Sequence, residues 1–252
     1  MYARALRRAF GALILVAATS TVSHAQVPVV FGQSWDGISL QSILDSRYGA
    51  NHFSYSLNYS GASAADPDPW FWVADGFSAL LVREVAGNAS RNILGWYAET
   101  DGAYKPTIDG IDDGVVFDGP AGAGATTIIT FDRSHKKFGF YLNPNGTGNA
   151  INAPEPELFF TNRRYNDIGP NGQNALHAPY DGDVQAIVYD VSTLSQPNTW
   201  LVCFEDLDSG ANPGPCCATT DNDFNDFVFE VTALGPTKNA SISFGGIKAR
   251  YR

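Results

Sequence analysis

The chain has 252 residues, a formal net charge of −10, 44% hydrophobic residues and 13% aromatic residues. Nucleic acids and anionic membrane surfaces require clustered Lys and Arg, so an acidic chain of this kind excludes both as expected partners. The 25 glycines and 14 prolines, together with the aromatic content, indicate a turn-rich β-protein with a hydrophobic core rather than a disordered chain.

Residues 1–25 have the pattern of a secretory signal peptide. A segment with three arginines precedes an uncharged apolar run over 10–18, and Ser23-His24-Ala25 offers small residues to a signal peptidase. The apolar run is much shorter than the roughly 20 residues that cross a bilayer, and no second such run follows. The pair Arg7-Arg8 leaves twin-arginine export open as a second route. We therefore expect a secreted, extracellular protein, periplasmic or surface-associated in some settings, that begins at Gln26.

Removing this segment takes away three arginines and no acidic residue, so the mature chain carries a net charge of −13. In chain order, a short helix is predicted from Leu40, capped by Ser39 and stopped by Gly49. Short segments with strand character are separated by Asn, Asp, Gly and Pro. The predicted strands cover 27–31, 51–59, 70–73, 79–85, 93–99, 126–131, 137–142, 157–161, 184–190, 200–205 and 227–232.

This succession of short strands predicts an all-β fold, an antiparallel β-sandwich of jelly-roll-like type with one short N-terminal helix. Residues 26–240 are expected to form a single β-sandwich domain. Residues 241–252 form a basic tail, which reads either as a frayed end or as a sorting signal.

Two acidic segments, 205–208 and 221–226, contain the side chains that point most clearly to a metal site. Calcium takes six to eight oxygen ligands from carboxylates, amides and backbone carbonyls, and both segments supply such groups beside a strand. The predicted ligands are Glu205, Asp206, Asp208, Asp221, Asp223, Asn225 and Asp226. An EF-hand is excluded, because Asp226 stands where its loop requires Gly and Thr232 stands where it requires Glu. The alternative is an Asx-rich turn, in which these side chains cap backbone N–H groups.

The order Phe204-Glu205-Asp206, a loop, then Asp221-x-Asp223-Phe224-Asn225-Asp226 and a last strand resembles the DUF4114 domain of secreted bacterial proteins, with the motif at 200–232. The upstream segments 35–41, 81–87 and 93–97 are similar to exported proteins of the PEP-CTERM type, which carry a C-terminal anchor. The resemblance implies a surface-associated, calcium-binding β-sandwich that is not an enzyme. This chain departs from the pattern in its Cys216-Cys217 pair and in the absence of an apolar span over 243–252.

The three cysteines are Cys203, Cys216 and Cys217. In an oxidising compartment, we expect a disulfide from Cys203 to one member of the adjacent pair, closing a loop of about a dozen residues. One thiol is then left over, and the sequence does not decide which. A zinc site is the weaker reading, because no histidine lies nearby.

Trp70 and Trp72 share one side of a predicted strand; we expect them to pack in the core or at a sheet edge, and a sugar-stacking platform is the alternative. Asp-Gly pairs at 109–114 and 181–183 read as hairpin turns or as parts of a second ion site. The histidines at 52, 135 and 177 match no catalytic spacing. The predicted function is a secreted calcium-binding protein with a structural or adhesive role toward extracellular polysaccharide or surface proteins. The alternatives are a carbohydrate-binding module and, further off, a hydrolase with paired carboxylates.

Overall fold

The computed structural model describes residues 29, 31–32, 34, 37–60, 72–86, 89–99, 106–131, 136–144, 158–162, 165–166, 184–206 and 221–235. The predicted signal peptide, the strand over 27–31 for the most part, the turn at 181–183 and the basic tail lie outside these residues. Within the described part of the chain, no helix has the length and apolar character needed to cross a membrane.

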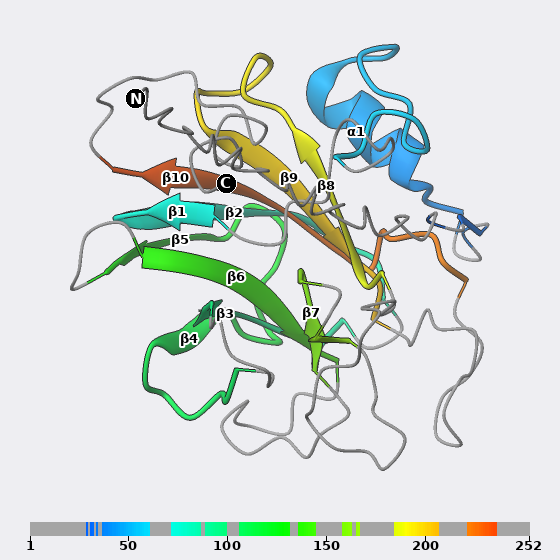
Figure 1. Ribbon diagram of the computed structural model, residues 1–252. Helices are drawn as coiled ribbons and strands as arrows, with labels where there is room; N and C mark the ends of the chain where they lie inside the picture. Colours follow the sequence, from blue (N-terminus) through cyan, green and yellow to red (C-terminus); the bar gives the residue numbers. More distant parts are fainter. Residues whose placement is uncertain are drawn as a thin grey trace, which may run out of the picture.

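Two antiparallel sheets face each other, as the sequence predicted for a β-sandwich (Figure 1). One sheet has the order β1-β6-β3-β4, with β7 also paired to β6, and the other has the order β5-β2-β10-β9-β8. The strands are β1 (Trp72–Ala74), β2 (Gly76–Glu84), β3 (Ile93–Ala98), β4 (Asp113–Phe117), β5 (Thr126–Thr130), β6 (Lys136–Asn143), β7 (Phe159–Phe160), β8 (Ala186–Asp190), β9 (Thr199–Phe204) and β10 (Phe227–Leu234).

The core between the sheets follows from the alternation of side chains along each strand. On β10, Phe227, Phe229 and Val231 point into this core, while Val228 joins a second apolar cluster on the outer face. Aromatic rings bridge the two sheets: Phe140 of β6 meets Phe229 edge to face, with ring centroids 5.1 Å apart. Such contacts add stabilisation beyond burial and fix how the sheets face each other.

A helix, α1 (Leu40–Tyr48), covers the outer face of the second sheet and lies beside β8 and β9 in Figure 1. Its start and end agree with the prediction, because the Ser39 hydroxyl accepts a hydrogen bond from Ser42 N at 3.2 Å and Gly49 ends it with φ +93°. Leu40, Ile43 and Leu44 are buried against the sheet. The helix therefore seals the second apolar cluster.

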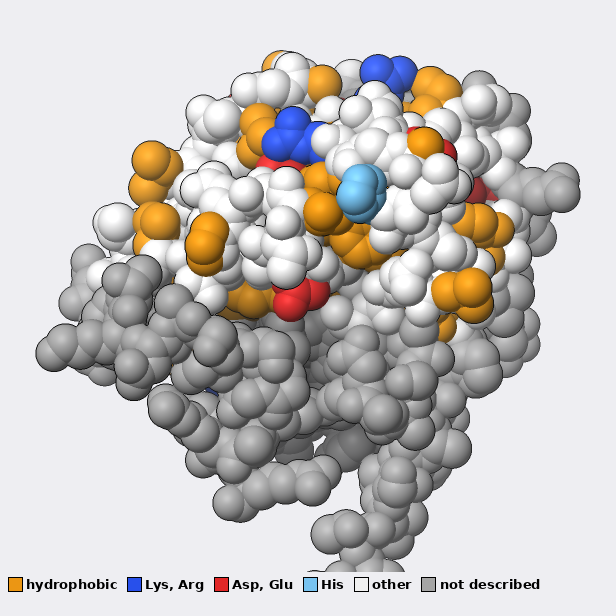
Figure 2. Space-filling model, turned by 90° about the horizontal axis from the view of Figure 1, so that it is seen from above, with side chains coloured by type: hydrophobic (Ala, Val, Ile, Leu, Met, Phe, Trp, Pro, Cys, Tyr) orange, Lys and Arg blue, Asp and Glu red, His pale blue; other side chains and the backbone are white. Residues whose placement is uncertain are grey.

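An ion pair fastens this helix to the centre of the sheet. Arg47 Nη2 lies 2.6 Å from Glu230 Oε2 of β10, and the Tyr48 hydroxyl donates to Glu230 Oε1 at 2.5 Å. Seen from the helix side, small patches of hydrophobic side chains lie among uncharged polar side chains and backbone atoms, and charged side chains are few (Figure 2). The guanidinium of Arg47 thus compensates the negative charge of the buried Glu230 carboxylate.

Two local predictions were wrong. Residues 51–59 form turns instead of a strand, because polar side chains take up the backbone: Ser54 N donates to Asn58 Oδ1 at 2.7 Å and Tyr55 N donates to Gln41 Oε1 at 3.1 Å. Strand β4 was not predicted, because its first residues, Asp113 and Gly114, are polar and flexible.

The Asp-Gly segment before β4 is a turn, as one of the two readings proposed. The Asp113 carboxylate accepts hydrogen bonds from Asp109 N at 2.9 Å and from Gly110 N at 3.1 Å, and Ala98 N bonds to Asp112 O across the hairpin. These carboxylates cap backbone groups in the manner of Asx turns. They lead the chain into β4 at the edge of the first sheet.

Trp72 lies in the core, as the core-packing reading predicted, and it is therefore not available for a sugar-stacking platform. It is 1% exposed, and its ring lies 5.2 Å from that of Phe140 and 6.3 Å from that of Trp200. The strand turns this face toward the opposite sheet, so the ring fills the sandwich interior. Trp70, the other tryptophan of this predicted strand, lies outside the described residues.

We expect Trp72→Ala to lower the free energy of unfolding by about 3–5 kcal/mol, because it empties a large volume in a packed core. Guanidinium unfolding followed by near-ultraviolet circular dichroism measures the loss, and Trp72→Phe serves as the milder control. Wild-type stability combined with lost polysaccharide binding would contradict the core assignment.

Candidate functional site

The pairing of β9 with β10 brings the two acidic segments together. These strands are antiparallel neighbours, and Phe204 at the end of β9 lies opposite Phe227 at the start of β10. Glu205 and Asp206 directly follow Phe204, and Asp226 directly precedes Phe227. Because the end of one strand lies beside the start of the next, the two acidic segments meet at one end of the sandwich.

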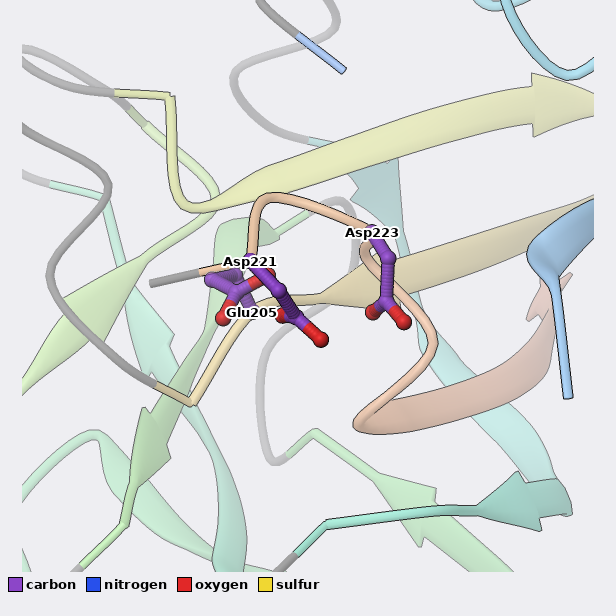
Figure 3. A group of neighbouring side chains, drawn as sticks. All are labelled: Glu205, Asp221 and Asp223. Carbon is purple, nitrogen blue, oxygen red and sulfur yellow. The ribbon is translucent and has the colours of Figure 1, made fainter. Parts of the chain in front are cut away.

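Two groups of carboxylates form there. Glu205, Asp221 and Asp223 each place an oxygen so that all three lie within 4.8 Å of one another. Figure 3 shows these side chains, with Glu205 on the segment after β9 and both aspartates on the loop that leads into β10. The second group joins the same Glu205 with Asp206 and Asp226, again within 4.8 Å.

These side chains are unusually buried for carboxylates. Glu205 is 1% exposed, Asp206 and Asp226 are each 5% exposed, and Asp223 is 6% exposed, while Asp221 is half-buried. Charged carboxylates are rarely buried to this degree unless they are paired or bind a metal. The site therefore lies in a part of the protein where charge must be compensated locally.

Hydrogen bonds hold the loop around this site. Asp206 N donates to Asp226 Oδ2 at 2.8 Å, and Phe224 N donates to Glu205 Oε2 at 3.4 Å. Asn225 N donates to Asp223 Oδ1 at 3.1 Å, a local Asx contact. Asp223 and Asp226 therefore accept hydrogen bonds from backbone N–H groups, as the Asx-turn alternative predicted, and both also belong to the carboxylate groups.

The Asn225 side chain connects the loop to the segment before α1. Its Nδ2 lies 2.6 Å from Asp223 Oδ2, and it also donates to the carbonyl of Ile38 and, at 3.3 Å, to the hydroxyl of Ser34. Asn222 and Phe224 have positive φ values of 51° and 53°, a conformation that non-glycine residues adopt only when their surroundings enforce it. Packing and hydrogen bonds together fix the loop.

The pKa values reflect the crowding of acids. Burial, followed by the charges of Glu205 and Asp206, raises the pKa of Asp226 to about 11. Burial also raises the pKa of Asp206. The ionised form is disfavoured by desolvation and by like charges, so the site favours either bound protons or a compensating cation.

Two further polar residues reach the second group and were not predicted. Asn92, just before β3, donates from Nδ2 to Asp206 Oδ2 at 3.3 Å. Glu84 is the last residue of β2. Burial is the main cause that raises the pKa of Glu84 to about 8; the hydrogen bond with Asn92 lowers this pKa, and the charge of Asp206 raises it. The register of β2 with β10, which sets Glu84 opposite Phe227, is the one signal that points to Glu84, and no sequence pattern points to Asn92.

Of the predicted ligands, the structure brings Glu205, Asp206, Asp221, Asp223, Asn225 and Asp226 together, and Asp208 lies outside the described residues. Cys203 is a free thiol with no exposed surface, which corrects the predicted disulfide from that residue. Its side chain belongs to the apolar cluster beneath α1, and burial raises its pKa well above the usual value. Cys216 and Cys217 lie outside the described part of the chain.

The fold and the site define an antiparallel β-sandwich with an acidic site at the junction of two neighbouring strands. Residues 133–233 match the family model described as "Domain of unknown function (DUF4114)", which supports the resemblance of this part of the chain to the DUF4114 family. The matched range includes both acidic segments and runs from just before β6 into the end of β10. No curated protein and no solved structure matches the chain.

Asp226→Asn should stabilise the protein in the presence of a chelator. The amide retains an oxygen to accept the hydrogen bond from Asp206 N, but it removes one of the crowded acids. We expect the Tm in EDTA to rise by roughly 2–4 °C, the shift that about 1 kcal/mol produces in a domain of this size. Differential scanning calorimetry measures it.

Asp190→Asn is the matched control, because Asp190 is exposed and sits at the other end of β8 from the site. Its Tm in EDTA should equal that of the wild type. A lower Tm for Asp226→Asn under the same conditions would show that crowding of acids does not destabilise the ion-free protein.

Proposed function

We propose that this protein is an exported calcium-binding β-sandwich with a structural or adhesive role at the cell surface or in the extracellular matrix, and that it is not an enzyme. Extracellular polysaccharides and surface proteins are the partners that this role implies. The observation that carries the calcium assignment is the convergence of Glu205, Asp221 and Asp223 on one small volume.

Oxygen ligands favour a hard cation at this position. The three converging groups are carboxylates, and the neighbouring polar side chain is the amide of Asn225. Among the residues that the structure describes, neither imidazole nor thiolate belongs to the group, so the donor set suits calcium better than zinc. Irregular loop geometry also suits calcium, which accepts varied coordination, better than magnesium, which requires a near-ideal octahedron.

Burial of the site supports a structural effect of the ion. A cation between Glu205 and the two loop aspartates would connect the end of β9 with the segment that leads into β10. An ion that binds only the folded state stabilises it by about 2.7 kcal/mol when its concentration is a hundred times the Kd. In an extracellular setting, where modules with Kd values of about 10⁻⁴–10⁻³ M are common, the folded state would depend on the ambient calcium.

We expect calcium to raise the Tm of the wild-type protein by roughly 5–10 °C relative to EDTA, which corresponds to the stabilisation above at about 2–4 °C per kcal/mol. Asp221→Asn should lose a large part of this shift, because Asp221 is half-buried and contributes a carboxylate to the site. Calorimetry over a calcium titration measures both.

The exposed Asp190→Asn variant again supplies the control and should retain the full calcium shift. An equal Tm in EDTA and in millimolar calcium for the wild type would refute the proposed function. If Asp221→Asn retains the full calcium-induced Tm shift, the ion binds somewhere other than the loop before β10.

Export predicts a defined processed form. Cleavage after Ala25 would leave Gln26 as the first residue, and mass spectrometry of protein recovered outside the cytoplasm should find that terminus. Ala25→Phe should block processing, since a bulky ring replaces a small residue at the cleavage position, whereas Gln26→Ser should leave it unchanged. Recovery of the protein with an intact Met1 terminus in the cytoplasm alone would contradict export.

A further inference from the structure

We propose that the second carboxylate group is a separate divalent-cation site, formed by Glu205, Asp206 and Asp226 and completed by side-chain oxygens of Asn92 and Glu84. The inference rests on the proposed calcium function and extends it from one ion to two, with Glu205 shared between them. The second site lies deeper than the first and draws on different strands.

The distances and the burial suit a bound ion. Calcium holds its oxygens at 2.3–2.6 Å, so two ligands of one ion lie at most about 5 Å apart. The three carboxylates of this group meet that limit, since their oxygens lie within 4.8 Å of one another. All three residues are at most 5% exposed, so solvent contributes little to balancing their charge.

An independent observation comes from Asn92. This residue has no exposed surface, and its Oδ1 has no hydrogen-bond partner among the described residues. The amide group is placed at the site, because its Nδ2 donates to Asp206 Oδ2 at 3.3 Å. A buried carbonyl oxygen without a partner is destabilising and rare in folded proteins, and a cation beside Asp206 would satisfy it.

Glu84 adds a second oxygen of the same kind. Its Oε1 is buried and likewise lacks a hydrogen-bond partner within the part of the chain that the structure describes. The register sets Glu84 opposite Phe227, and the next residue, Val85, donates its N–H to Asp226 O at 3.1 Å, so Glu84 lies beside the same group, where it is linked to Asn92 by a hydrogen bond. Carboxylate and amide groups from four chain segments thus meet beside Asp206.

Charge balance also favours two ions. The two groups and Glu84 together bring six carboxylates to this end of the sandwich: Glu84, Glu205, Asp206, Asp221, Asp223 and Asp226. One divalent ion would leave an excess of four negative charges, if all six are ionised, and two ions would leave two. A pair of cations bridged by Glu205 matches the site better than one.

The second ion would have a distinct mechanical role. The first connects only the end of β9 with the loop before β10, which belong to one sheet. The second would also contact Asn92, which leads into β3 of the other sheet. It would therefore act as a link between the two sheets of the sandwich.

Calcium stoichiometry of the full protein tests this inference. After equilibrium dialysis against millimolar calcium, atomic emission should find two ions per wild-type chain. Asp206 belongs only to the second group and Asp221 only to the first, so Asp206→Asn and Asp221→Asn should each retain one ion. Glu205→Gln should weaken both sites, and Asp190→Asn should keep two ions.

The outcomes separate the two claims. One ion in the wild type, still present in Asp206→Asn, would overturn the second site and leave the proposed calcium function intact. No ion in the wild type would overturn both. If circular dichroism shows that Asp206→Asn is unfolded, Glu84→Gln replaces it, since this half-buried position tolerates an amide of the same shape. Glu84→Gln should lower the affinity for one of the two ions about tenfold. Unchanged affinity for both ions would count against the second site.

Discussion

The pairing of β9 with β10 is the constraint on which the rest of the molecule depends. Phe204 and Phe227 lie opposite each other and both point into the core, which fixes the register at this end of the strands. The acidic residues begin one position beyond each phenylalanine. A shift of one residue would turn the aromatic side chains out of the core and onto the other face of the sheet, so the same packing that holds the sheets together also forces the carboxylates into one place.

This arrangement sets favourable packing directly against unfavourable electrostatics. Phe224 carries a positive φ, and its ring is buried 5.7 Å from that of Phe31, so its packing holds the loop between Asp223 and Asn225 in a strained conformation. Strain and clustered acids at one end of a well-packed sandwich are typical of a binding site supported by the remaining structure. The aromatic core supplies that support, and the loop geometry depends on it.

Local sequence patterns predicted what local physics determines. The alternation on β10 and the caps of α1 at Ser39 and Gly49 involve neighbours in the chain, and the structure confirms them. The segment 51–59 has strand-like composition, but its backbone is satisfied by Asn58 and Gln41, and composition does not report such contacts. Cys203 was misjudged for a related reason, because which face of a strand is covered depends on elements far away in the sequence.

The candidate site shows the same division. Glu205 and the run from Asp221 to Asp226 are recognisable because acids cluster along the chain beside strands. Asn92 carries no such signal, since it reaches Asp206 across 114 positions and from the other sheet. Its contribution follows only from the packing of one sheet on the other, which no local pattern encodes.

Two buried acids, one in β10 and one directly before it, differ in how their charge is compensated. Glu230 is 6% exposed and is matched by the guanidinium of Arg47 and the hydroxyl of Tyr48, both supplied by α1. Asp226, four residues earlier and 5% exposed, has a pKa that is raised by burial and then by the charges of its acidic neighbours Glu205 and Asp206. At Glu230, a protein side chain, Arg47 of α1, thus compensates the charge of the buried carboxylate. The contrast between these two acids, four residues apart, is in line with the proposal that bound cations compensate the charge at Asp226.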